Sequence, residues 1–91
     1  MNEQACLIEL GKRLAQARIH AEMTQQELSD KAAISLATLS NVERGHPMTT
    51  STLYRILQAF DQSSKLADLF PEPVIDPIAL RKLKKIRGRV R

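Results

Sequence analysis

The chain has 91 residues, a length that suits a single domain near the lower limit for folding on its own core. Hydrophobic residues make up 43% of it but aromatic residues only 3%, which favours small helices over a β-sandwich or β-barrel. The single cysteine, Cys6, excludes an internal disulfide and fits a reducing compartment. There is no signal peptide and no apolar run of about 18 residues, so we expect a cytoplasmic protein that does not span a membrane.

The net charge of +4 is unevenly distributed along the chain. Residues 78–91 carry seven of the 14 lysines and arginines and none of the ten acidic residues, which leaves residues 1–77 with a net charge of −3. Attraction for a polyanion such as DNA is therefore expected from this tail, or from local patches on a mildly acidic body.

The first predicted helix runs from Glu3 to about His20. Its apolar residues recur at spacings of three and four: Leu7, Leu10, Leu14 and Ala17. Gly11 lies inside this helix at a cost of about 1 kcal/mol relative to alanine. Such a cost is tolerated where another helix approaches closely, so we expect a close helix contact at Gly11.

The segment TQQELSDKAAISLATLSNVERG predicts two short helices joined by a tight turn. Thr24 is a suitable N-cap, and Glu27 three residues later completes a capping box. Ser35 caps the second helix in the same way, and Gly45 ends it with Pro47 two residues beyond. Apolar or small residues fall where the unit must close on itself: Leu28, Ala32, Ile34, Leu39 and Val42.

Two further helices are predicted after this unit. One spans Thr50 to about Phe60 and buries Leu53, Ile56, Leu57 and Phe60. The other spans roughly Ser64 to Phe70 and carries Leu66, Leu69 and Phe70. The prolines of PEPVIDP then predict a stiff linker over residues 71–77, followed by a basic, flexible tail over residues 78–91. We therefore predict one helical domain over residues 1–70.

The second helix of the two-helix unit carries the chemistry of a DNA reader. An α-helix fits the major groove, and its first turns bring side chains to base edges. On the outer face, Asn41 suits a bidentate contact to adenine, while Leu36 and Ala37 suit thymine methyl groups. Arg44 at the helix end suits guanine or a phosphate. Three residues with hydroxyl groups complete the predicted DNA-binding set: Ser35, Thr38 and Ser40. For Thr38 and Ser40 the expected partner is a phosphate or water.

Gln25 and Gln26 lie on the first exposed turn of the preceding helix. There, side-chain amides and free backbone N–H groups suit phosphate oxygens. Because the reading face has few hydrogen-bonding groups, we expect a substantial contribution from phosphate contacts and DNA shape.

At these residues the sequence resembles the Xre family of Cro/cI-type repressor domains, which are compact five-helix DNA-binding modules. The resemblance covers about residues 7–70 and rests on TQQEL, AIS and NVERG at the family spacing. It implies that Gln25 holds a backbone phosphate and that bases are read by three residues: Leu36, Ala37 and Asn41. It also implies an ion pair between Arg18 and Glu43 that fixes the reading helix against the scaffold.

Two positions depart from the family pattern. Ala33 stands in the turn where glycine is usual, so a positive φ at this residue would cost about 1 kcal/mol. Ser29 replaces the small alanine that is usual early in the first helix of the unit, which is a mild change.

The LFPEP sequence after the domain and the basic end RKLKKIRGRVR resemble HipB-like antitoxins. This resemblance implies a protein that represses its own operon as a dimer and binds a HipA-type Ser/Thr kinase toxin. We therefore predict an all-α, sequence-specific transcriptional repressor that binds a palindromic operator in double-stranded DNA as a homodimer. The candidate dimer surface consists of Leu66, Leu69 and Phe70.

The alternative function is a protein-interaction module that acts mainly by holding a partner protein. The mildly acidic body and the few hydrogen-bonding groups of the reading face favour it. The sequence has no nucleophile–base arrangement, no glycine loop for phosphate and no metal-ligand cluster, so we predict no enzymatic activity, cofactor or metal site.

Overall fold

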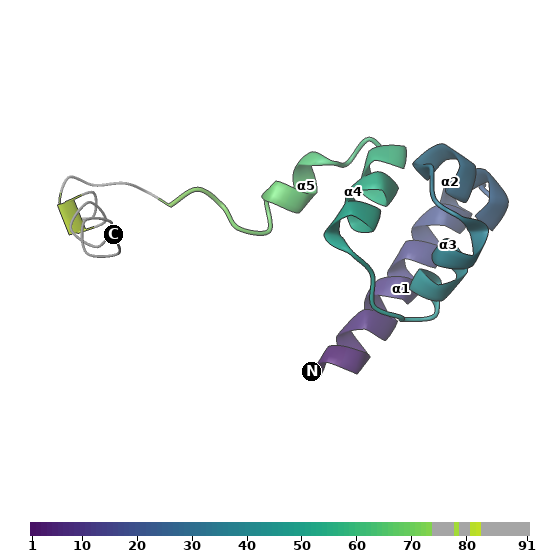
Figure 1. Ribbon diagram of the computed structural model, residues 1–91, viewed down its shortest axis with the longest axis horizontal. Coiled ribbons are helices and arrows are strands. Elements are labelled where there is room, and N and C mark those ends of the chain that lie inside the picture. Colours follow the sequence, from purple (N-terminus) through teal and green to yellow (C-terminus); the bar gives the residue numbers. More distant parts are fainter. Residues whose placement is uncertain (74–77, 79–80, 83–91) are drawn as a thin grey trace.

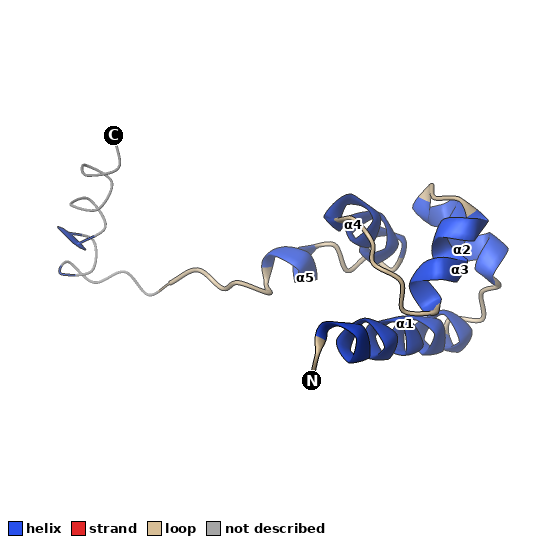
Figure 2. Cartoon of the chain, turned by 60° about the horizontal axis from the view of Figure 1, so that its bottom comes forward, coloured by secondary structure: helices blue, strands red, loops and turns tan. Residues whose placement is uncertain are grey.

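The computed structural model describes residues 1–73, 78 and 81–82. This part of the chain forms five α-helices and no β-strand: α1 (Glu3–His20), α2 (Gln25–Ala32), α3 (Leu36–Glu43), α4 (Thr50–Ala59) and α5 (Ser64–Ala67). The predicted all-α, five-helix fold is confirmed. Helix α1 packs against α3, and α2 packs against both α3 and α4. The first turns of α1 extend past the other helices, and α5 leads away from α4 (Figures 1 and 2).

Each of the first four helices begins at a side chain that caps its first turn. The Thr24 hydroxyl accepts from the backbone N–H of Glu27, and the Glu27 carboxylate accepts from the backbone N–H of Thr24, so the predicted capping box is present. Ser35 caps α3 as predicted. Asn2 and Thr49 cap α1 and α4 in the same way, and the sequence analysis did not name them.

The same four helices end in one shared motif, in which a residue with positive φ reverses the chain. These residues are Glu22 (φ 58°), Ala33 (φ 56°), Gly45 (φ 91°) and Asp61 (φ 56°). In each case the N–H of the following residue bonds back across the last turn, as from Ile34 to the Ser29 carbonyl at 3.0 Å, which defines a Schellman motif. The positive φ expected at Ala33 is therefore present.

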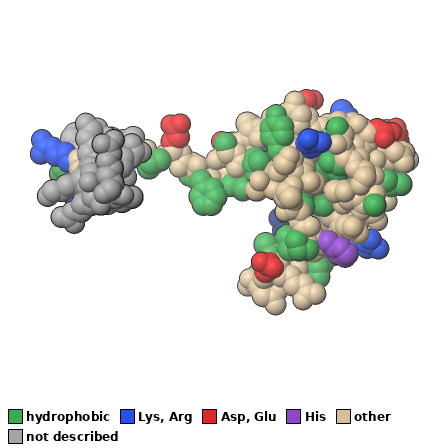
Figure 3. Space-filling view, in the orientation of Figure 1, with side chains coloured by type: hydrophobic (Ala, Val, Ile, Leu, Met, Phe, Trp, Pro, Cys, Tyr) green, Lys and Arg blue, Asp and Glu red, His purple; other side chains and the backbone are tan. Residues whose placement is uncertain are grey.

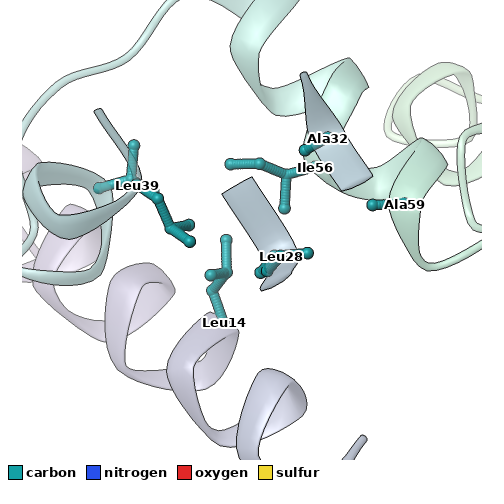
Figure 4. Packing of buried hydrophobic residues seen from close by; sticks show 7 residues of the cluster. Leu14, Leu28, Ala32, Leu39, Ile56 and Ala59 are labelled. Atoms are coloured by element: carbon teal, nitrogen blue, oxygen red, sulfur yellow. The ribbon is translucent and has the colours of Figure 1, made fainter. Parts of the chain in front are cut away.

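The core lies where α1, α2, α3 and α4 meet. Leu14, Leu28, Leu39 and Ile56 each come from a different helix and point toward one another (Figure 4). Three smaller side chains complete the buried cluster: Ala32, Val42 and Ala59. The burial of Ala59 was not predicted from the apolar spacing of α4. Leu10 and Ala17, which share the apolar spacing of the first helix, are exposed.

The last helix is shorter than predicted. It ends at Ala67, and Leu69 and Phe70 are 65% and 87% exposed. Pro71 explains the early end, because a proline disfavours the α conformation in the residue before it. No helix of the described residues is both long and apolar enough to cross a membrane. The predicted tail falls almost entirely outside the described residues.

Candidate nucleic-acid interface

Helix α3 turns one face inward and leaves the other face open. Leu39 and Val42 are buried, with at most 2% of their surface exposed, and hold the helix against the core. Leu36, Ala37 and Arg44 are exposed on the opposite side. The remaining predicted residues of this helix are half-buried along its flanks: Thr38, Ser40 and Asn41. The predicted reading residues therefore lie on an accessible helix surface.

The N-terminus of α3 is fixed by its cap. The Ser35 side chain accepts from the backbone N–H of Thr38 at 3.0 Å and donates its own proton to the Thr38 hydroxyl at 2.7 Å. These bonds hold the first turn, where Leu36 and Ala37 point outward. The cap thus gives a rigid start to the helix segment that would enter a groove.

Asn41 and Arg44 interact near the C-terminal end of the same helix. The Arg44 guanidinium donates a hydrogen bond to the side-chain oxygen of Asn41. A bidentate contact to adenine needs this oxygen as an acceptor and the amide nitrogen as a donor. Arg44 must therefore share or release Asn41 before the predicted adenine contact can form.

The N-terminus of α2 offers backbone and side-chain donors next to this face. Its cap leaves the first backbone N–H groups, at Gln25 and Gln26, without an acceptor inside the helix. The Gln26 amide donates to Asp30 at 2.9 Å along the exposed side of α2. The Gln25 amide instead crosses to α3 and donates to Glu43 at 3.0 Å. Free N–H groups at a helix N-terminus suit an anionic phosphate.

Arg18 and Glu43 join α1 to the end of α3. Their two side chains form a fork-shaped pair, with Arg18 Nε 2.8 Å from Glu43 Oε2 and Arg18 Nη2 3.1 Å from Glu43 Oε1. Arg18 Nη1 also donates to the carbonyl oxygen of Met23 at 2.9 Å, in the loop before α2. The side chains are only 14% and 7% exposed, so the pair is screened little by solvent.

The region before α4 adds a surface that the sequence analysis did not name. A hollow of about 390 Å³ lies between α3 and the start of α4, and its lining includes Asn41, His46, Thr49 and Thr52. Thr49 caps α4, so the first backbone N–H groups of that helix are also free of intrahelical acceptors. Thr49 lies three residues before Thr52 and just ahead of an apolar periodic run, and this sequence signal could have identified the cap.

Charge is mixed rather than concentrated on the body of the protein. In the face shown in Figure 3, acidic and basic side chains are interspersed among polar and apolar ones. Described residues near the two-helix unit include the cations Lys31, Arg44 and Arg55, the last of which donates to the Ala33 carbonyl oxygen at 3.0 Å. Among the described residues no group of histidine, cysteine and acidic side chains is placed to hold a metal ion.

Two short capped helices joined by a tight turn, with one exposed reading face, define a helix-turn-helix DNA-binding domain. A family model described as helix-turn-helix matches residues 14–69 of the chain. The chain therefore belongs to the Xre/Cro-type helix-turn-helix family, and it is a DNA-binding transcription regulator. No curated protein matches the sequence closely.

Proposed function

We propose that this regulator is a repressor that binds a palindromic operator as a homodimer and reads each half-site with α3. The observation that carries the proposal is the exposed face of α3, held in place by buried Leu39 and Val42. Side chains on such a helix reach base edges in the major groove. In this proposal Asn41 contacts adenine, and Leu36 and Ala37 contact thymine methyl groups.

Phosphate contacts from two helix N-termini support this docking. The free N–H groups and amides at Gln25 and Gln26 lie at the start of α2, and Thr49 caps the start of α4 beyond the other end of α3. Two donor groups that flank a reading helix position it on the duplex without reading sequence themselves. Half-sites of a dimeric operator would then lie about one helical turn, about 34–36 Å, apart.

We further propose that the repressor acts on its own operon as the HipB-like antitoxin of a toxin–antitoxin pair. The support is the sequence that follows α5, LFPEP and then RKLKKIRGRVR, which resembles the ends of such antitoxins. Its partner would be a HipA-type kinase. Helix α5 ends at Ala67, and the exposed Leu69 and Phe70 supply the apolar surface proposed for the homodimer.

A protein-binding role remains the second candidate, and one observation favours it. An open, mainly apolar hollow of about 440 Å³ lies between the end of α1 and the α4–α5 connection, lined in part by Ala17, Leu57 and Phe60. Together with Leu69 and Phe70, it gives the protein apolar surface that DNA binding does not use. A DNA-binding antitoxin would use both surfaces.

The proposal is tested by titrating the protein against a fluorescent duplex from its own upstream region and against random duplex, at two salt concentrations. We expect specific binding at moderate salt, and a loss of about 1–3 kcal/mol of binding free energy in each of Asn41→Ala and Arg44→Ala. Gln58→Ala, an exposed change near the far end of α4, is the matched control and should bind normally.

Deletion of residues 72–91 separates the two candidate functions. Specific binding that survives the deletion would assign sequence reading to the helical domain. Binding that ignores sequence, and that disappears with the deleted residues, would contradict the repressor proposal and favour the protein-binding role. In that case the partner should be sought by co-purification with the product of a neighbouring kinase-like reading frame.

A further inference from the structure

We propose that Glu43 is a positioning residue for DNA binding, because it orients the side-chain amide of Gln25 toward a phosphate. The inference rests on the proposed docking of α3 in the major groove. It assigns Glu43 a role beyond its ion pair with Arg18, since one carboxylate oxygen, Oε1, accepts from both Arg18 Nη2 and Gln25 Nε2.

The first step is the chemistry of the amide. A glutamine side chain has a nitrogen with two N–H donors and an oxygen acceptor at its end, and rotation about its last bond exchanges their positions. An ionised carboxylate only accepts hydrogen bonds, so Glu43 selects the orientation in which the Gln25 nitrogen faces it. One N–H of this nitrogen bonds to Glu43, and the second is the donor that we assign to a phosphate at the start of α2, where the first backbone N–H groups have no intrahelical acceptor.

The second step is electrostatic. A bare carboxylate beside a phosphate would repel it, but Arg18 forms a two-bond pair with Glu43 and neutralises its charge. Gln25 is half-buried and the Glu43 side chain is 7% exposed, so solvent screens these charges and hydrogen bonds only weakly. The result is a neutral donor group rather than a negative one at the start of α2.

The third step is the coupling of helices. Glu43 lies in the last turn of α3, Gln25 in the first turn of α2, and Arg18 also holds the Met23 carbonyl oxygen in the intervening loop. A phosphate held at Gln25 is therefore linked by two hydrogen bonds to the helix that reads bases. Gln26 offers the contrast, because its amide is held by Asp30 on α2 alone.

The test is a double-mutant cycle between Glu43→Gln and Gln25→Met, read by anisotropy with a duplex selected from a random library by the wild-type protein. We expect Gln25→Met to weaken binding about tenfold, as for the loss of one hydrogen bond to a charged group. Glu43→Gln should weaken binding about tenfold in the wild-type background and less than about twofold in the Gln25→Met background. Glu9→Gln and Arg13→Met, which break an exposed ion pair on α1 outside the proposed interface, form the matched control cycle and should show neither a loss of affinity nor coupling.

Two further readouts separate positioning from a loosened recognition helix. The ratio of specific to random binding should not change in either variant. The slope of log affinity against log salt should not change in Gln25→Met, because a neutral amide releases no counterions. A lower specificity ratio, or the same loss from Glu43→Gln in both backgrounds, would overturn the inference. Gln25→Met keeps the Arg18–Glu43 pair, and circular dichroism verifies that each variant is folded during the titration.

Failure of this inference is distinguishable from failure of the proposed function. If Asn41→Ala weakens specific binding as the proposed function expects while Gln25→Met leaves the affinity unchanged, only the role of Glu43 is overturned. If the wild-type protein selects no duplex from the library, the proposed function fails and the inference fails with it.

Discussion

Gly11 in α1 lies directly against the backbone of Val42 in α3. A Cβ atom at position 11 would overlap the carbonyl oxygen of Val42 and would lie 2.8 Å from the carbonyl oxygen of Glu43. The close helix approach predicted at Gly11 is therefore present, and the approaching element is the recognition helix itself.

We expect Gly11→Ala to lower the free energy of unfolding by about 1–3 kcal/mol, because two rigid backbone carbonyls must move to admit the methyl group. This loss should outweigh the gain of about 1 kcal/mol in helix propensity. Urea unfolding measures the difference, with the exposed neighbour Lys12→Ala as control. A stabilised Gly11→Ala variant would show that α1 and α3 lie farther apart.

Ala33→Gly should instead stabilise the protein, by about 0.5–1 kcal/mol, because Ala33 adopts a left-handed conformation that favours glycine. The same change at Ala17, an exposed residue inside α1, should destabilise by about 1 kcal/mol. Chemical denaturation of both variants checks the opposite signs. If both variants lose a similar amount of unfolding free energy, the left-handed conformation at Ala33 is contradicted.

Arg18→Met should lower the free energy of unfolding by about 3 kcal/mol, because it leaves the Glu43 carboxylate buried without its cation. Replacing both residues, as Arg18→Met with Glu43→Met, should recover most of this loss, since no buried charge remains. Arg13→Met breaks the exposed pair with Glu9 and should change stability by less than about 0.5 kcal/mol. Strictly additive losses in the double variant would argue against a coupled pair.

The capping box predicts a pH-dependent term in stability. The hydrogen bond from the Thr24 backbone, and then that from its side chain, lower the pKa of Glu27 below its ordinary value of 4.5. Because its pKa is lowered in the folded state, ionised Glu27 stabilises the fold at pH values above its ordinary pKa. This contribution to the free energy of unfolding is lost as the pH falls through the pKa of the folded state. Glu27→Ala should therefore cost stability at pH 7 and little near pH 2, as measured by urea unfolding at each pH.

The homodimer proposal predicts that Leu69→Ser combined with Phe70→Ser gives a monomer in sedimentation experiments. Both side chains are largely exposed in the single chain, so the unfolding free energy per monomer should change by less than about 0.5 kcal/mol. Tyr54→Ser, which removes an exposed aromatic ring from α4, should leave the dimer intact. A dimer that persists in the double variant would place the contact elsewhere.

Local sequence signals predicted most helix boundaries because caps act within a few residues. Thr24, Glu27 and Ser35 form the bonds that their spacing predicted. The end of α5 was predicted wrongly because the apolar spacing of Leu66, Leu69 and Phe70 continues a helical period, whereas Pro71 acts against it. Apolar spacing alone does not tell whether a neighbouring element covers a side chain.

Helical periodicity predicted which face of α3 is exposed, but it did not predict the hydrogen bonds that the side chains of this helix form. Gln25 and Glu43 are 18 residues apart, and their hydrogen bond depends on how α2 and α3 cross. The bond between Arg44 and Asn41 depends on rotamers that a spacing rule does not specify. Sequence patterns therefore located the candidate site, while its hydrogen-bond connections required the three-dimensional structure.

The positive φ values at Glu22, Ala33 and Asp61 have a consequence at the level of the gene. Codons for glutamate, alanine and aspartate all begin with G, and a change of the middle base to G turns each of them into a glycine codon. Three substitutions that relax a strained helix end are thus reachable by single-nucleotide mutation. More stable variants are therefore reachable for this protein without any change in its core or its reading face.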